Sequence, residues 1–385
     1  MNLLKYIVRN TFRHKLRTSL TVLGMAIVVL AYCLLRTVVA AWYAGVEASS
    51  PNRLITRNAV SLIFPLPISY LSRIKEVPGV VAISYGRWFG GIYINEKNFF
   101  PQFAVDPEHY LDLYPEFLVP EKQLEAFKKD RRGCIAGRRI ARKYGWKIGD
   151  TITIRGTIFP GTWDFILRGI YRGRDKGTDE SQFFFHWDYL NESLKKTMPL
   201  RADHVGWFVV KIADASRAAQ ISRKIDSLFE NSLAETLTET EKAFQMGFVS
   251  MTEAIVVAIK VISYVVIGII LVVLSNTMAM TARERTREYG VLKTLGFEGP
   301  FLFKLIIGES LTIAVTGGIL GIILSFPAAR IFAKSLETFF PIFNLSLKTL
   351  ASGLLAATIV GILSGIFPGI KASRTSIVDS LSHLG

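Results

Sequence analysis

The residue types that most often carry chemistry in proteins are few in this chain, and they are scattered. No His-x-x-x-His or Cys-x-x-Cys spacing brings two metal ligands or two thiols together. The histidines are His14, His109, His186, His204 and His383, and the cysteines, which we do not expect to form a disulfide, are Cys33 and Cys134. One acidic cluster comprises Asp175, Asp179 and Glu180; it could hold a metal ion, but its interleaved basic residues favour a solvated turn.

The chain also lacks the residues that would cradle a nucleotide phosphate. The pattern Gly-x-x-x-x-Gly-Lys-[Ser/Thr] is absent, and no Gly-Lys dipeptide occurs anywhere. We therefore expect that the chain is not an enzyme and holds no cofactor or metal of its own. A membrane-anchored enzyme with a site in residues 43–250 is the interpretation that the residues support least.

One short charged segment has the pattern of a docking element. Tyr289, Leu292 and Leu295 are spaced three apart, and Gly296 stands where a helix end favours a left-handed residue. The pattern predicts a short amphipathic helix pressed against a membrane face. The charged side chains that it would offer to a partner are Glu284, Arg285, Arg287 and Glu288. A polar loop that only connects two helices is the alternative.

Four apolar runs separate the polar segments of the chain, and this charged segment lies between the second and the third. They cover approximately residues 19–42, 254–278, 301–326 and 350–367, and about 20 residues suffice to cross a bilayer core. The charged residues within them are Arg36, Lys260 and Glu309. Because all three lie near the ends of their runs, we expect Arg36 and Lys260 to extend to the interface, and Glu309 to pair with Lys304.

The distribution of basic residues predicts how the runs are oriented. Segments 1–17, 281–304 and 371–385 hold 12 Lys and Arg against 4 Asp and Glu, about half of the net charge of +15. These segments fall on one side if all four runs cross, and the positive-inside rule makes that side the cytoplasm. A nucleic-acid partner is not expected, because the excess charge lies beside apolar runs. We expect the first run, which is longer than a signal-peptide core, to stay uncleaved.

The predicted organisation follows from these assignments. The fold class is an α-helical membrane protein with four transmembrane helices and an α+β extracytoplasmic domain inserted between helices 1 and 2. The predicted parts are a cytoplasmic interfacial helix (1–17), transmembrane helix 1 (18–42), the extracytoplasmic domain (43–250), transmembrane helix 2 (251–280), a cytoplasmic coupling segment (281–300), transmembrane helix 3 (301–333), an extracytoplasmic loop (334–349), transmembrane helix 4 (350–370) and a cytoplasmic tail (371–385).

The first 17 residues have their own periodicity. Apolar residues such as Leu4, Ile7 and Val8 recur at helical spacing, and four basic residues lie largely on another face: Lys5, Arg9, Arg13 and Arg17. This pattern predicts an amphipathic helix that lies on membrane lipid. A solvated flank that only sets the topology is the alternative.

The inserted region alternates strand and helix patterns, which favours an α+β fold. The predicted strands are 80–85, 91–95, 151–155, 165–171 and 205–212, and the predicted helices are 120–130, 138–144 and 215–229. Aromatic residues at 88–89, 99–100 and 183–187 are expected to lie mostly in the core, although some could serve a surface for lipid or protein.

Several segments together resemble one known family. Glu284-Arg-Thr-Arg-Glu-Tyr-Gly-Val-Leu-Lys-Thr-Leu-Gly296 resembles the cytoplasmic segment of MacB/LolC/FtsX-type ABC transporter permeases. Arg17-Thr-Ser-Leu-Thr-Val-Leu-Gly24, the segment 135–150 and the closing segment 368–381 are similar to further family motifs, in the same order. Ser376 and Ser380 stand where the family often has proline and alanine. The inserted region matches only around 134–155.

The resemblance implies a permease subunit that dimerises, with an identical or a different permease, and docks on a separate ABC-type ATPase dimer, which binds ATP and Mg. ATP hydrolysis there would drive the outer domains to export or extract a lipid, lipoprotein, peptide or drug, with a periplasmic adaptor or carrier protein as a further partner. An FtsX-like subunit that regulates an extracytoplasmic hydrolase is the alternative. The location implied is the bacterial inner membrane, with both termini cytoplasmic. The coupling residues carried over are Glu284, Arg285, Arg287, Glu288, Gly290, Leu295 and Gly296.

Overall fold

The computed structural model describes residues 3–175, 177–335 and 342–376, which divide into two compact units. A helical unit contains Met1–Trp42, Glu253–Ser335 and Phe343–Gly385, and an inserted domain contains Tyr43–Thr252. The helical unit is therefore discontinuous in the way that the sequence predicts, with the domain placed between the first long helix and the other three.

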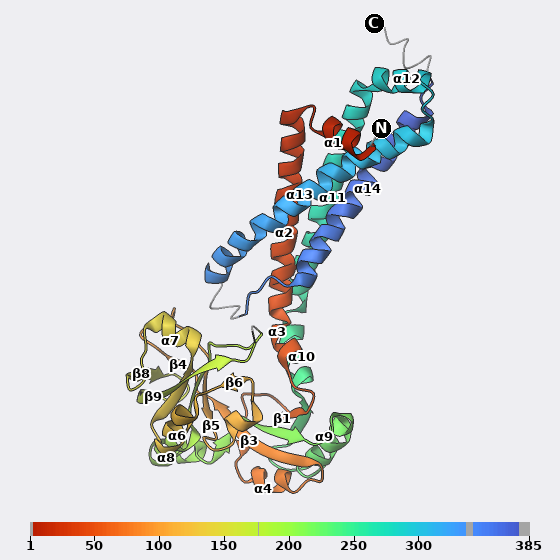
Figure 1. Ribbon diagram of the computed structural model, residues 1–385. Helices are drawn as coiled ribbons and strands as arrows, with labels where there is room; N and C mark the ends of the chain where they lie inside the picture. The colour runs from red at the N-terminus through yellow and green to blue at the C-terminus, as the bar shows by residue number, and fades with distance from the viewer. Residues whose placement is uncertain (1–2, 176, 336–341, 377–385) are drawn as a thin grey trace. The chain divides into compact units, whose positions relative to one another are not determined.

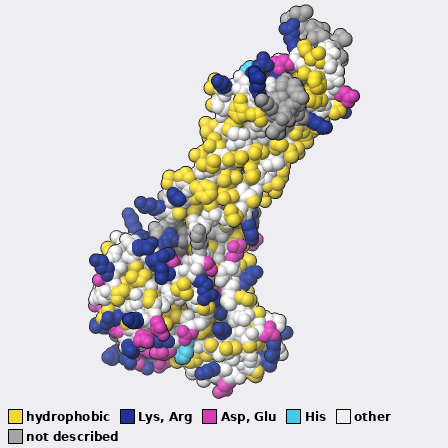
Figure 2. All heavy atoms as spheres, in the orientation of Figure 1, with side chains coloured by type: hydrophobic (Ala, Val, Ile, Leu, Met, Phe, Trp, Pro, Cys, Tyr) yellow, Lys and Arg dark blue, Asp and Glu magenta, His cyan; other side chains and the backbone are white. Residues whose placement is uncertain are grey.

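Four helices of the helical unit are long and apolar enough to cross a membrane. Within the described residues they are α2 (Lys15–Trp42), α11 (Glu253–Glu284), α13 (Gly299–Ser335) and α14 (Leu347–Arg374). Figure 1 shows them extending alongside one another, with the short helix α12 (Thr286–Thr294) and the N-terminal helix α1 (Leu3–Thr11) near the same end. Hydrophobic side chains cover the middle of this unit, and Lys and Arg side chains gather at the end with α1 and α12 (Figure 2).

The N-terminal segment does not form the single helix predicted over residues 1–17. Helix α1 ends at Thr11, and Lys15 begins α2, so Arg17 belongs to the first spanning helix and Arg13 to the bend between the two helices. The Thr18 hydroxyl donates a hydrogen bond to the Thr11 carbonyl at 2.6 Å, which satisfies a group that the helix end leaves without a partner. Ile7 of α1 is buried, and it faces Gly308 of α13.

Helix α13 packs closely against both α2 and α14. A Cβ atom on Gly321 would lie 2.5 Å from the Ala26 carbonyl oxygen of α2. A Cβ atom on Gly361 of α14 would lie 2.8 Å from the Ala314 Cβ of α13. Small residues allow membrane helices to approach in this way, so dispersion contacts accumulate along their full length.

The inserted domain is built on one mixed sheet. In spatial order its strands are β13 (Thr236–Thr240), β1 (Arg53–Asn58), β12 (Trp207–Ile212), β3 (Val80–Trp88), β5 (Gln102–Val105), β10 (Phe183–His186), β7 (Gly133–Gly137), β9 (Gly161–Gly173), β8 (Thr151–Gly156) and β4 (Gly91–Ile92), with β6 (Phe117–Leu118) paired to β9. Strands β10 and β5 are parallel, as are β7 and β9, and the other pairs are antiparallel. A separate small ribbon pairs β2 (Leu66–Pro67) with β11 (His204–Val205).

Helices accompany this sheet, so the domain is α+β as predicted. They are α3 (Ala44–Ala48), α4 (Tyr70–Lys75), α5 (Tyr110–Leu113), α6 (Glu121–Lys129), α7 (Arg138–Tyr144), α8 (Trp187–Thr197), α9 (Ala218–Ser227) and α10 (Glu241–Met251). The two faces of the sheet contribute to separate cores: Phe183 and Phe185 lie in one, and Phe184 lies in the other. The prediction that the aromatic residues are mostly core is confirmed, with Trp88 and Phe99 the more exposed ones.

Candidate coupling site

The candidate site is the break between α11 and α12, within the segment 284–296 that carries the resemblance. Helix α11 ends at Glu284 and α12 begins at Thr286, so Arg285 occupies the junction. Helix α12 ends at Thr294, and Gly296 has the predicted left-handed backbone, with a φ of +89°. The predicted short helix and its glycine stop are therefore confirmed.

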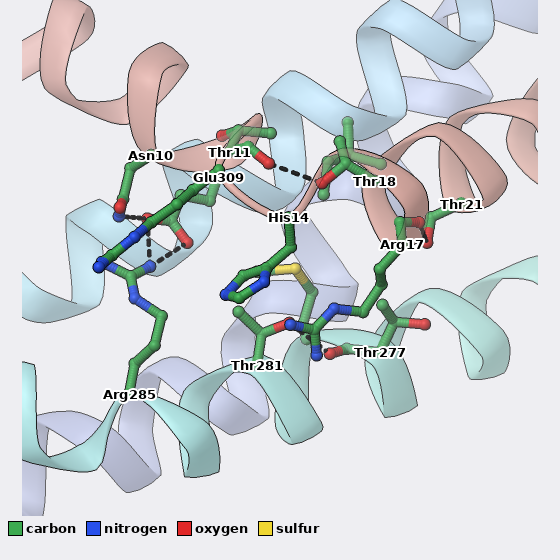
Figure 3. A pocket seen from close by; sticks show the side chains of 13 residues that line it. Asn10, Thr11, His14, Arg17, Thr18, Thr21, Thr277, Thr281, Arg285 and Glu309 are labelled. Atoms are coloured by element: carbon green, nitrogen blue, oxygen red, sulfur yellow. Dashed lines mark hydrogen bonds and ion pairs between the residues drawn. The ribbon is translucent and has the colours of Figure 1, made fainter.

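Arg285 points into the protein and pairs with an acid of α13. Its Nη1 atom donates to both carboxylate oxygens of Glu309, at 2.8 and 3.0 Å, and the exposed fractions of the two side chains are 6% and 4%. Asn10 of α1 donates to the same carboxylate from another direction (Figure 3). The prediction that Glu309 pairs with Lys304 is wrong, because Lys304 lies on the exposed side of α13.

Arg285 was expected to be exposed to a partner, but the structure buries it. Burial alone would lower the pKa of Arg285, but Glu309 and Glu288 raise that pKa above its usual value. The guanidinium therefore stays charged, and its planar fork suits a carboxylate. Arg285 is not offered to a partner by its side chain, contrary to the sequence interpretation.

The two acidic residues of the motif contact the N-terminal basic residues. Glu284 pairs with Arg17 at 2.7 Å, and Glu288 pairs both with Arg13 and with the Arg285 Nε atom, the latter at 2.9 Å. Partial burial would raise the pKa of Glu288, but the two arginines lower it below its usual value. Of the basic residues predicted on the interfacial helix, Arg13 and Arg17 therefore form ion pairs, Arg9 is exposed, and the side chain of Lys5 lies outside the described residues.

Helix α12 has one anchored side and one exposed side. Tyr289 and Gly290 are buried, and the Lys293 ammonium donates to the Ser373 and Thr375 carbonyls at the end of α14, at 2.9 and 2.6 Å. Arg287 is exposed, as are Val291 and Leu295, whose exposed fractions are 50% and 70%. Two residues of the predicted apolar stripe therefore differ in burial: Tyr289 is buried within the protein and Leu295 is exposed at its surface.

A small polar cavity adjoins the ion pairs. It has a volume of about 30 Å³, enough for one or two water molecules. Figure 3 shows side chains of α1, α2, α11 and α13 around it, and its lining includes Asn10, His14, Arg17, Thr277, Thr281, Arg285 and Glu309. Its walls offer both donors and acceptors, which suits water better than a single kind of ion.

The remaining candidate residues do not converge. Asp179 accepts hydrogen bonds from Ser181, and Glu180 accepts two from Arg138. Across the described residues, no group of three or more His, Cys, Asp and Glu side chains could hold a metal ion. Cys33 and Cys134 are both buried and free. Arg36 and Lys260 are half-buried in α2 and α11, and their extension to an interface stays a prediction. Ser380 and the end of the closing motif lie outside the described residues.

The sequence missed Asn10, Lys293 and Glu309 as members of this site. Glu309 carried a signal, since an acid inside an apolar run needs a partner, but its partner lies in another element. Lys293 lies within the segment 284–296 that carries the resemblance but was not singled out, and Asn10 had no distinguishing signal.

Comparison with known proteins identifies the class of molecule to which this site belongs. Residues 18–228 match the MacB-like periplasmic core domain, and residues 260–377 match the FtsX-like permease C-terminal domain. The chain belongs to the MacB/FtsX-type ABC transporter permeases. The permease is 23% identical to an uncharacterized ABC transporter permease of Methanocaldococcus jannaschii, an alignment that covers 99% of this chain and 97% of that protein.

Two further likenesses cover parts of the permease. It is 33% identical over 125 residues to the macrolide export ATP-binding/permease protein MacB of Burkholderia pseudomallei, which covers 32% of this chain and 18% of that protein. The crystal structure of the periplasmic region of MacB from Actinobacillus actinomycetemcomitans matches with a TM-score of 0.39 and 10% identity, covering 53% of this chain and 95% of that chain.

Proposed function

We propose that this permease couples ATP hydrolysis on a separate ATPase subunit to movement of its inserted domain, which exports or extracts a substrate at the outer face of the cytoplasmic membrane. It acts as a dimer of permeases on a dimer of ATPases, and ATP and Mg bind to the ATPase alone. Both chain termini and α12 lie in the cytoplasm, and the inserted domain lies outside, with a carrier or adaptor protein as its further partner.

The observation that carries this proposal is the two-sided character of α12. Its inner side is joined to the bend between α1 and α2, to α13 and to the end of α14 by ion pairs and hydrogen bonds, through Glu288, the junction residue Arg285, and Lys293. Its outer side exposes Arg287, Val291 and Leu295. The exposed side therefore offers two apolar side chains and one arginine to a partner protein, while the contacts of the inner side hold the helix in place. Such a helix is suited to receive a force from that partner.

The inserted domain supports transport rather than regulation of a hydrolase. The MacB-like core match extends through most of this domain, and a protein of that name is described as a macrolide export protein. Transport and regulation would use the same coupling helix, so the choice between them rests on the inserted domain alone.

The test is capture of the ATPase by the full-length permease after extraction in mild detergent. Wild-type permease should retain the ATPase subunit encoded with it and stimulate its turnover. Leu295→Asp and Arg287→Glu should each lower the amount of ATPase captured at least tenfold.

The matched controls change a leucine and a basic residue in the same way at the opposite end of the helices. Leu347 and Lys348 are exposed at the start of α14, so Leu347→Asp and Lys348→Glu should capture the ATPase normally. Equal capture by Leu295→Asp and Leu347→Asp would count against α12 as the docking helix.

A further inference from the structure

The junction at Arg285 is built so that α12 cannot change its tilt without affecting α13. Arg285 interrupts the long helical path from α11 into α12, with φ and ψ of −102° and 14°. Its side chain leaves this junction toward Glu309 rather than along either helix. The covalent path from α12 leads to α11 and, through Gly296, to the start of α13, whereas the Arg285 side chain makes a direct contact in the interior of α13.

The contact is closed into a ring of polar residues. Arg13 pairs with Glu288, Glu288 with Arg285, Arg285 with Glu309, and Glu309 accepts from Asn10. Asn10 lies at the end of α1 and Arg13 lies three residues later, in the bend before α2, so the ring joins α1, α12 and α13. A charge pair that is removed from bulk water depends strongly on its geometry, because bulk solvent cannot replace a lost partner.

Helix α13 is able to pass a displacement onward. It is closely packed on α2 at Gly317 and Gly321, and the Ser310 hydroxyl lies 2.6 Å from the Ser364 hydroxyl of α14. Helix α11, by contrast, has the largest exposed share of the four long helices. Close-packed elements transmit strain with little compression, so a movement of α13 also moves α2, the helix that leads into the inserted domain.

We propose that the Arg285–Glu309 pair, steadied by Asn10, is the joint through which a movement of α12 reaches the membrane helices. Glu309 is then a positioning residue for coupling, although it lies outside the docking surface. This inference rests on the proposed function, and it separates docking, which uses Arg287 and Leu295, from transmission, which uses Arg285 and Glu309.

The experiment compares capture, stimulation and stability in full-length permease with its ATPase. The informative variant is the double substitution Arg285→Gln with Glu309→Gln, because removing both charges leaves no buried ion without a partner. The control is Glu298→Gln with Lys304→Gln, which removes one acid and one base from exposed positions near the same end of α13. Both proteins should melt within a few degrees of wild type, and both should capture the ATPase.

If the Arg285–Glu309 pair transmits the movement of α12, only Arg285→Gln with Glu309→Gln should lose stimulation of ATP turnover. Its stimulation of ATP turnover should fall at least tenfold with capture within twofold of wild type, while the control stimulates normally. Normal stimulation by Arg285→Gln with Glu309→Gln would overturn the inference, as would a parallel loss of capture and stimulation, which would assign the pair to folding alone. If wild-type permease neither captures nor stimulates the ATPase, the proposed function itself fails, and the inference fails with it.

Discussion

Glu309 is an acid buried inside the helical unit, where its side chain is 4% exposed. It lies against Arg285 and Asn10 beside a cavity with room for only one or two water molecules, so bulk solvent cannot take the place of either partner. Breaking a buried ion pair from one side leaves a charge without compensation, whereas removing both charges is often close to neutral. The pair is therefore expected to matter more for which arrangement the helices adopt than for the total free energy of unfolding.

Substitution of one member of this pair should destabilise the fold. Glu309→Gln leaves Arg285 buried beside a neutral amide, and we expect a loss of about 3–5 kcal/mol in the free energy of unfolding. A thiol-reactive fluorophore can report melting in detergent, because Cys33 and Cys134 are both buried in the folded protein. Glu298→Gln serves as the exposed control. A melting temperature for Glu309→Gln equal to that of the control would mean that the pair contributes nothing.

A histidine of the inserted domain should make stability depend on pH. His186 is buried, and its Nε2 atom lies 2.6 Å from the Phe127 carbonyl oxygen. Burial lowers the pKa of His186 below its usual value of 6.5, even though the nearby carbonyl and acids oppose this. The unfolded chain therefore binds a proton more readily than the folded chain. Stability contributed by neutral His186 is complete above about pH 6.5 and is lost as the pH falls through the folded pKa.

The comparison of His186→Gln with wild type isolates that contribution. Between pH 7.5 and 5, melting of the wild type should move to lower temperature more steeply than melting of His186→Gln. Identical slopes for wild type and His186→Gln would show that protonation of this residue is not linked to folding.

At the scale of elements, local signals predicted helices better than strands. Helix α7 has the predicted bounds, and α6 differs by one residue at each end. Strand β10 was treated only as an aromatic cluster, because a short continuous apolar run that is buried on both faces carries no alternation. The strand predicted over 205–212 is divided at Gly206, and the one predicted over 91–95 ends at Ile92. Strands β1 and β13 pair with each other, and neither was predicted.

The contact between α2 and α13 permits a test of helix packing. A Cβ on Gly321 would approach the Ala26 carbonyl oxygen and the Val29 Cβ, both within 3 Å, whereas a Cβ on Gly268 of α11 would meet nothing within 4 Å. Gly321→Val should therefore force α2 and α13 apart and lower stability by about 1–3 kcal/mol. Gly268→Val, which adds the same side chain to a spanning helix, should melt within a degree or two of wild type. The packing argument fails if the two variants melt together.

At the scale of the whole molecule, the sequence predicted the architecture but not the ion-pair network. The four helices and the inserted α+β domain follow from long apolar runs and from local periodicity. The partners of Arg13, Arg17 and Arg285 do not, because Arg13 and Glu288 are separated by 275 residues and Arg17 and Glu284 by 267. Local spacing reveals pairs only between residues that are close in sequence. These pairs form only because tertiary packing brings the two segments together.

The orientation of the whole molecule is the remaining prediction, and exposed positions on each predicted side can test it. The positive-inside rule places α12 in the cytoplasm, and the inserted domain and the start of α14 outside. Thr294, Lys211 and Lys348 are exposed at these three places, and the natural cysteines are both buried. A membrane-impermeant maleimide applied to intact spheroplasts should therefore label Lys211→Cys and Lys348→Cys but neither wild type nor Thr294→Cys.

Permeabilising the membrane supplies the control for the negative result. Thr294→Cys should then become labelled to the same extent as the other two variants, which shows that its thiol is accessible once the reagent can reach it. Labelling of Thr294→Cys in intact spheroplasts would place α12 outside, where no cytoplasmic ATPase could contact it. If Lys211→Cys were labelled and Lys348→Cys were not, the start of α14 would not lie on the outer side. The chain between these two residues would then cross the membrane once, not twice. The same three cysteine variants therefore test two predictions: the number of helices that cross the membrane, and the side on which α12 would meet an ATPase. Both predictions follow from the positions of the basic segments.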